Sequence, residues 1–160
     1  MPSEEIVVLQ PKVGYLMILK EYLVVFLTSI LNIQGIGPAY AESLAAAGIS
    51  SVEKLLEAGS GKNGRMGIAE RTGIAEKLIL EWVNRSDLFR IKGVGEKYSD
   101  LLVEAGVDTV VELSKRIPEN LYAKLAEVNG TRKLVKRNPT LPEVKSWVEQ
   151  AKALPRMIQH

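Results

Sequence analysis

Residues 33–55 read IQGIGPAYAESLAAAGISSVEKL, and residues 91–113 read IKGVGEKYSDLLVEAGVDTVVEL. The two stretches are separated by a shift of 58 residues, and nine of their 23 aligned pairs are identical. Several of the other pairs are close exchanges, such as Ile36 with Val94 and Ile49 with Val107. Self-similarity over a stretch of this length indicates a duplicated unit, and it organises most of the chain.

The repeat continues more weakly toward the C-terminus. Residues 68–73 correspond to residues 125–130, and Trp82 corresponds to Trp147 at the longer shift of 65. The second copy therefore holds about seven extra residues, which we place around residues 136–139. We expect an N-terminal apolar segment and first helix over 1–32, a first unit over 33–90 and a second unit over 91–155, with the two units sharing one core.

Residues typical of helix ends recur in both copies and predict short helices. Glycine ends helices at Gly48, Gly73 and Gly106, and proline begins them at Pro38 and Pro118. Capping boxes run from Ser50 to Glu53 and from Thr140 to Glu143, and Asp108 or Thr109 caps the helix between Gly106 and Pro118. A further helix is expected from about Ile74 to Asn84. No segment longer than four residues alternates like an exposed strand, so the predicted fold class is all-α.

Each copy begins with an apolar residue, a Gly-apolar-Gly turn and a small residue four positions later. The glycines allow a tight turn with positive φ, the middle apolar residue fills the core, and the small residue lets two helices cross closely. Together with the shared Ala-Gly-apolar ending, this pattern resembles the helix-hairpin-helix motif over residues 24–155. It is closest to a family of tandem helix-hairpin-helix proteins of bacteria and archaea that carry a domain of unknown function.

This resemblance implies that backbone N–H groups of the hairpin hold a nucleic-acid phosphate at the N-terminus of the following helix, where the helix dipole also favours an anion. The first hairpin, at Gly35 and Gly37, has uncharged neighbours. The second hairpin is the better candidate because it is basic, although Glu96 would compete with a phosphate. Its candidate residues are Arg90, Lys92, Gly93, Val94, Gly95 and Lys97. The alternative interpretation is that both turns only permit close helix packing.

A local excess of basic residues supplies a second candidate contact. The chain has a formal net charge of only +2, but residues 115–137 hold seven basic and two acidic side chains. A helix through the end of this segment would gather four of them on one face, and their alternative role is a solvated helix face. These four are Arg132, Lys133, Lys136 and Arg137. We interpret the tyrosines Tyr40, Tyr98 and Tyr122 and the two tryptophans as core residues, not as platforms for bases.

The composition argues against most enzyme chemistry. There is no cysteine, and the only histidine is His160. Disulfides, thiolate metal sites and cysteine nucleophiles are therefore excluded, and histidine-based acid–base catalysis is improbable. The Gly59–Lys62 segment lacks the spacing of a phosphate-binding loop, and Asp108 follows the hairpin too closely for a DNA glycosylase. We expect no catalytic residues, no metal and no cofactor, and a cytoplasmic location.

The most hydrophobic run of the chain is residues 15–31, YLMILKEYLVVFLTSIL. A membrane span is disfavoured because the run is short and carries Lys20 and Glu21 near its middle. A signal peptide is disfavoured because the chain opens with acidic residues. A core or partner-facing helix fits best, and membrane attachment is the minority alternative.

Two functions follow from these features. The first is a non-enzymatic module that binds nucleic acid, in particular duplex or branched DNA, through its phosphate backbone and without sequence specificity. The second is a protein-interaction or scaffold module in which the hairpins are purely structural and the 15–31 helix packs on a partner or a second copy. The near-zero net charge and Glu96 favour the second; the paired hairpins and the basic segment favour the first.

Overall fold

The computed structural model describes residues 28–160. A short 3-10 helix, η1 (Ile30–Asn32), precedes eight α-helices, and no strand forms within the described residues. The all-α prediction is confirmed. The helices are α3 (Pro38–Ala46), α4 (Val52–Gly59), α5 (Lys62–Thr72), α6 (Glu76–Leu88), α7 (Glu96–Glu104), α8 (Val110–Ser114), α9 (Pro118–Arg132) and α10 (Leu141–Ala153).

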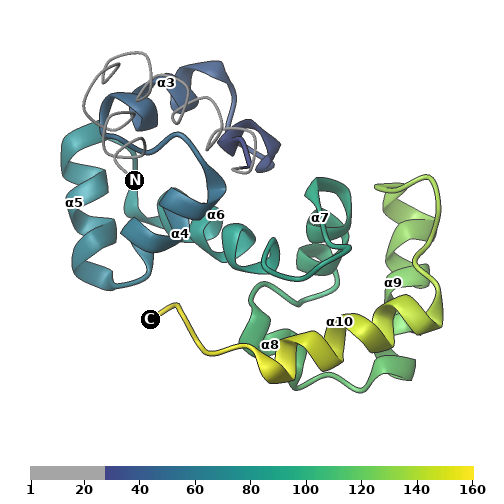
Figure 1. The fold of residues 1–160 in the computed structure, drawn as a ribbon. Helices are drawn as coiled ribbons and strands as arrows, with labels where there is room; N and C mark the ends of the chain where they lie inside the picture. Colours follow the sequence, from purple (N-terminus) through teal and green to yellow (C-terminus); the bar gives the residue numbers. More distant parts are fainter. Residues whose placement is uncertain (1–27) are drawn as a thin grey trace, which may run out of the picture.

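The helices form two lobes of four (Figure 1), and the lobes repeat the same local contacts. In the turn before α3, the N–H of Ile36 donates to the carbonyl of Ile33 at 3.1 Å. In the turn before α7, the N–H of Val94 donates to the carbonyl of Ile91 at the same distance. After each helix the chain closes again with a 2.8 Å bond, from Ile49 to Leu44 and from Val107 to Leu102. The two copies of the sequence repeat therefore adopt the same backbone path at both ends of α3 and α7.

Most of the expected helix ends are confirmed. Gly48, Gly73 and Gly106 all have positive φ, Pro38 and Pro118 begin helices, and Thr140 and Glu143 form a complete capping box. Thr109 caps α8 by accepting the N–H of Glu112. The expected cap at Ser50 is wrong: Ser51 caps α4 by accepting the N–H of Lys54 at 3.1 Å.

The carboxylate of Glu53 explains this displacement. It accepts the N–H of Thr28 at 3.0 Å, on the segment that precedes η1, so it does not return to the start of its own helix. Helix α6 is also longer than expected, because it continues past Asn84 to Leu88.

The buried apolar side chains form two clusters, one in each lobe, rather than the single shared core expected from the sequence. Helix α6 belongs to both, since Val83 lies in the first cluster and Leu88 in the second. Between them the same helix carries polar residues. Among these, Arg85 pairs with Asp100 of α7. The polar turn of α6 interrupts the apolar contact between the lobes.

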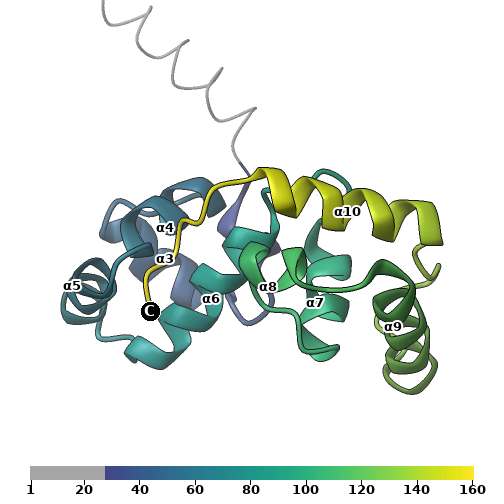
Figure 2. The same cartoon turned by 90° about the horizontal axis from the view of Figure 1, so that it is seen from below.

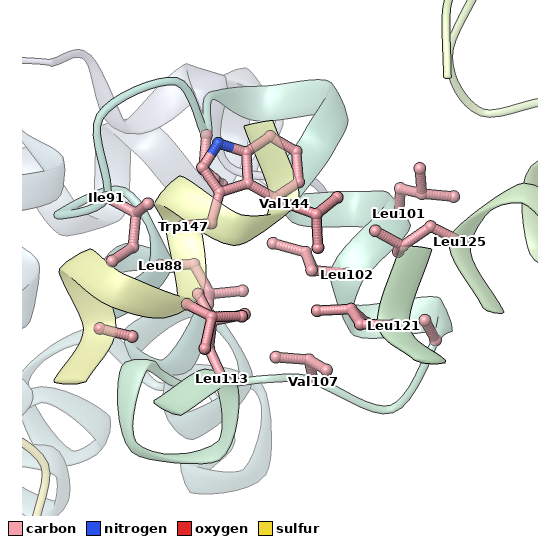
Figure 3. Close-up of a cluster of buried hydrophobic side chains, with 14 of the residues drawn as sticks. Leu88, Ile91, Leu101, Leu102, Val107, Leu113, Leu121, Leu125, Val144 and Trp147 are labelled. Carbon is pink, nitrogen blue, oxygen red and sulfur yellow. The ribbon is translucent and has the colours of Figure 1, made fainter. Parts of the chain in front are cut away.

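The two tryptophans are core residues, as expected, and each is 2% exposed. Figure 3 shows Trp147 packed over Val144 and Leu102, with Leu88 and Ile91 beside it. Tyr98 is half-buried, but Tyr40 and Tyr122 are 40% and 39% exposed, so the expectation that they belong to the core is wrong. The ring of Tyr40 nevertheless packs against that of Trp82, with 5.0 Å between the ring centroids.

The chain after α10 returns to the first lobe (Figures 1 and 2). Ile158 is buried in the first cluster, and the N–H of Gln159 donates to the carbonyl of Ser60 at 2.7 Å. The guanidinium of Arg65, itself buried, donates to the carbonyl of Gln159 at 2.8 Å. The C-terminal segment thus ties the second unit to the first.

The predicted 15–31 helix lies almost entirely outside the described residues. Of its last residues, Ile30 is buried in the first cluster and Leu31 is exposed. Among the helices of residues 28–160, none has the length and apolar character needed to span a membrane.

Candidate nucleic-acid interface

The two Gly-apolar-Gly turns have almost the same geometry. Gly35 has a φ of 97° and Gly93 a φ of 95°, in the region that side chains avoid. A Cβ at either position would lie 3.1 Å from the indole Nε1 of Trp82 or Trp147 respectively. The backbone conformation therefore favours glycine, and the tryptophan that packs against the turn leaves little room for a side chain.

The second glycine of each turn begins a helix without a side-chain cap. Gly37 is the N-cap of α3 and Gly95 the N-cap of α7, and neither helix start receives a side-chain hydrogen bond. By contrast, α4, α8 and α10 are capped by hydroxyls. The first amides of α3 and α7 have no intrahelical partner and, with the helix dipole, form a surface suited to an anion.

The two helix starts differ in their surroundings. At α3, Pro38 removes one donor, and the residues on either side of the turn are uncharged. At α7, Glu96 and Lys97 occupy the first two positions; Glu96 is half-buried and Lys97 is exposed. Lys92 is exposed on the turn itself. Only the second turn has cations beside it.

The basic segment after α9 is a loop, so the predicted helix through Arg132, Lys133, Lys136 and Arg137 is wrong. Helix α9 ends at Arg132, and Lys133 takes the left-handed conformation with a φ of 52°. In the first lobe the residue that ends α5 in the same left-handed conformation is Gly73, for which this conformation has little cost. The second lobe therefore places a lysine where the backbone favours glycine.

The loop and the start of α7 nevertheless meet. They surround a hollow, which we term the basic hollow, lined by Lys97, Tyr98, Lys133, Leu134, Val135, Lys136 and Arg137. The hydroxyl of Tyr98 donates to the carbonyl of Arg137 at 2.9 Å and fixes the loop to α7. Lys97 thus shares one concave surface with three basic residues of the loop, Lys133, Lys136 and Arg137, which are far from it in the sequence.

The charges around the basic hollow are not equally available. Arg137 makes a bidentate pair with Glu143 at 2.9 and 3.0 Å, and this contact helps to lower the pKa of the Glu143 carboxyl to about 2. Arg132 pairs with Glu104 at 2.6 Å. Lys97, Lys133 and Lys136 form no ion pair with any residue of the 28–160 segment.

Comparison with known families places the chain. A family model described as a domain of unknown function, DUF4332, matches residues 34–154. The chain belongs to the DUF4332 family. No curated protein and no solved structure matches it.

Arg90 is engaged inside the DUF4332 domain. Its guanidinium binds the buried carboxylate of Asp87 at 2.7 Å and the carbonyl of Pro155 at 3.0 Å. The second carboxylate oxygen of Asp87 accepts the N–H of Val110 at 2.8 Å, at the start of α8. These contacts give Arg90 a structural role, and it does not line the basic hollow.

Several residues that organise this surface of the DUF4332 domain were not identified from the sequence. Gln150 of α10 accepts the N–H of Lys92 at 2.8 Å and donates to its carbonyl at 3.2 Å, which holds the second turn. Asn129 holds the loop from inside, and Tyr98 fixes it to α7. No local spacing marks Gln150 or Asn129. The recurrence of Tyr98 opposite Tyr40 was the one available signal.

Proposed function

We propose that this DUF4332 chain is a non-enzymatic, tandem helix-hairpin-helix module that binds nucleic acid through sequence-independent contacts with the phosphate backbone. DNA is the nucleic acid that we expect it to bind. The observation that carries the proposal is the basic hollow. There Lys97, in the first turn of the uncapped helix α7, lines the same hollow as Lys133 and Lys136. None of these three lysines has an ion-pair partner among residues 28–160. Such a surface matches the charge and the acceptor oxygens of a phosphate.

The assignment of two helix-hairpin-helix units, residues 33–90 and 91–155, is supported by the repeated turn contacts and by the repeated glycine–tryptophan packing. The units have different roles in this proposal. The second unit binds phosphate at its turn, at Gly93 and Gly95, with Lys97 and the loop lysines. Val94 supports that turn without contacting the phosphate, because its N–H already donates to the carbonyl of Ile91 and its side chain is buried. The first unit, at Gly35 and Gly37, is chiefly architectural because its turn has no cation beside it.

The charge distribution sets the expected strength of binding. Only a few phosphates can be neutralised by three lysines and one helix start, and the net charge of +2 adds little long-range attraction. We therefore expect weak, salt-sensitive binding, with a dissociation constant of about 10⁻⁵ M, in the range of non-specific complexes.

The absence of cysteine from the sequence fits the reducing cytoplasm, where we place the protein.

A protein-interaction module is the second candidate. It is supported by Arg132 and Arg137, whose charges are already balanced by Glu104 and Glu143, and by the exposed, uncharged first turn with Tyr40. In that case the hairpins are structural and the chain binds a protein or a second copy of itself.

The decisive experiment is fluorescence anisotropy with a labelled duplex at low and moderate salt. Neutralising Lys97, Lys133 and Lys136 together to glutamine should weaken binding about tenfold or more and flatten the salt dependence, because about three counterions fewer are released. A matched control changes Lys54, Lys62 and Lys77, which are exposed on the first lobe, and alters the net charge equally.

The control separates a local site from general attraction. The control variant should bind almost like the unmodified protein. Equal losses in both variants would remove the basic hollow from the proposal. No binding by the unmodified protein at low salt and high micromolar concentration would overturn nucleic-acid binding itself and favour the protein-interaction module.

A further inference from the structure

The basic hollow belongs to the second lobe alone among the described residues. Helices α5 and α6 of the first lobe are joined by three residues, 73–75, whereas α9 and α10 are joined by residues 133–140. The longer connection contributes five of the seven residues that line the hollow. This surface is therefore an addition to the repeated unit, and its chemistry is not explained by the hairpins.

The connection is held in one conformation by its own hydrogen bonds. The side-chain amide of Asn129 accepts the N–H of Val135 at 2.9 Å and donates to the carbonyl of Val135 at 3.0 Å. It also donates to the side chain of Asn138 at 2.6 Å. Together with the bond from Tyr98 to Arg137, these contacts preorganise the loop, so that little ordering is needed when a ligand binds.

The hollow combines a cationic rim with apolar side chains. Leu134 and Val135 are half-buried, packed against the second cluster, and still line the hollow. The ring of Tyr98 lies between the hollow and the core, 5.3 Å from the ring of Trp147. A lining of this kind offers van der Waals contact as well as charge.

A phosphate of an intact duplex uses only half of this surface. Its oxygens can reach the lysines, but it has no apolar group to place on Tyr98, Leu134 and Val135. An unpaired nucleotide has both parts, because its base presents a flat apolar face beside an anionic backbone. Paired bases in a duplex are stacked and cannot be offered to the hollow without being extruded.

We propose that the basic hollow binds an unpaired nucleotide, so that the chain prefers single-stranded tails, gaps or forks to intact duplex. This inference rests on the proposed function. The lysines hold the flanking phosphates, and the base lies on the apolar lining. Because the contacts to the base are apolar, the preference does not depend on base identity.

The test compares a blunt duplex with the same duplex carrying a single-stranded oligothymidine tail. One base packed on the lining should make the tailed substrate bind about fivefold to tenfold more tightly. Val135→Ser should abolish this preference, so that the blunt and tailed substrates bind with equal affinity. Val128→Ser is the matched control, because Val128 packs on the same cluster but does not line the hollow.

Equal affinity of the unmodified protein for blunt and tailed substrates would overturn the inference and leave the proposed function standing. Absence of salt-dependent binding to either substrate would overturn both. A tail preference that is lost equally in Val135→Ser and Val128→Ser would also count against the hollow, since the loss would then follow the packing of the cluster.

A second measurement does not depend on variants. In methyl NMR spectra of the unmodified protein, a short single-stranded oligothymidine should shift the resonances of Leu134 and Val135 and leave those of Val103 and Val128 in place. Inorganic phosphate should not produce the methyl shifts. A short oligouridine distinguishes DNA from RNA as the source of the unpaired nucleotide. If neither strand shifts Leu134 and Val135, the inference is wrong.

Discussion

Single residues fix the two turns on which the repeat depends. Each turn uses one glycine for a left-handed backbone and for the close approach of a tryptophan, at Gly35 with Trp82 and at Gly93 with Trp147. The next glycine in each turn has a different role. Gly37 and Gly95 have extended backbone and open space where a Cβ would stand. Two glycines separated by one residue thus answer to different physical constraints.

The second turn allows this difference to be measured. Gly93→Ala should destabilise the fold by about 2 kcal/mol, since alanine is strained at a φ of 95° and its methyl crowds Trp147. Gly95→Ala should change stability by less than about 1 kcal/mol, because nothing lies near its Cβ. Urea denaturation followed by tryptophan fluorescence compares them. Similar losses in both variants would show that the packing of the tryptophan is not the constraint.

Lys133 has a left-handed backbone conformation that lowers the stability of the fold. A side chain in the left-handed region costs about 1 kcal/mol, and Gly73, which ends α5 of the first lobe in the same conformation, largely avoids that cost. Lys133 has no ion-pair partner among the described residues, yet it lines the basic hollow. If Lys133 serves the proposed binding of phosphate, Lys133→Gly should stabilise the fold and weaken binding to nucleic acid.

At the scale of helices, the sequence predicts those helix ends that depend on residues within one turn of the chain. Gly48, Gly73 and Gly106 end helices, and Thr140 caps one, because those signals act within a single turn of the chain. The cap at Ser51 was missed by one residue because Glu53 is drawn to Thr28, a contact 25 positions away. The 132–137 helix was wrong for a similar reason: Asn129 and Tyr98 hold those residues as a loop.

The candidate site was likewise predicted only in part from the sequence. The glycines of the second turn and the basic character of residues 132–137 are visible in the sequence. Their meeting at one hollow depends on the loop closing on Tyr98, and the clamp of Gln150 on Lys92 joins residues 58 positions apart. Such contacts are set by the packing of α10 against its neighbours, and no local pattern encodes them.

Helix α10 provides a prediction about pH. Glu143 accepts the N–H of Thr140 at 2.8 Å and pairs with Arg137, and its pKa is lowered from 4.5 to about 2. The folded state therefore binds the proton less readily than the unfolded chain. The stabilisation is complete above the unfolded value of 4.5, decreases below it, and is almost lost near 2.

Glu143→Gln keeps an oxygen that can accept the N–H of Thr140, but it loses the ion pair with Arg137 and the negative charge at the start of α10. It should therefore lower the free energy of unfolding by about 0.5–1 kcal/mol at neutral pH. The difference between the variant and the unmodified protein should shrink as the pH falls from 4.5 toward 2. Urea titrations across this range measure it. A difference that stays constant with pH would show that the carboxylate charge contributes nothing.

At the scale of the whole molecule, the two lobes have separate cores but are not independent. Helix α6 contributes to both clusters, and the C-terminal segment crosses back to bury Ile158 in the first. The returning segment also satisfies Arg65, whose guanidinium donates to the carbonyls of Gly59, Ser60 and Gln159. The first lobe is thus completed by residues that follow the second in sequence, which couples the stability of the two.

This coupling is testable through one side chain. Ile158→Ala should destabilise the protein by about 2–4 kcal/mol, as expected for a buried isoleucine that leaves a cavity. Its effect on amide hydrogen exchange should be largest in α4 and α5, although residue 158 follows α10. The matched control is Ile117→Ala, because Ile117 is 60% exposed and its loss should cost less than about 0.5 kcal/mol. If exchange in Ile158→Ala increases only near the C-terminus, the C-terminal segment does not contribute to the stability of the first lobe.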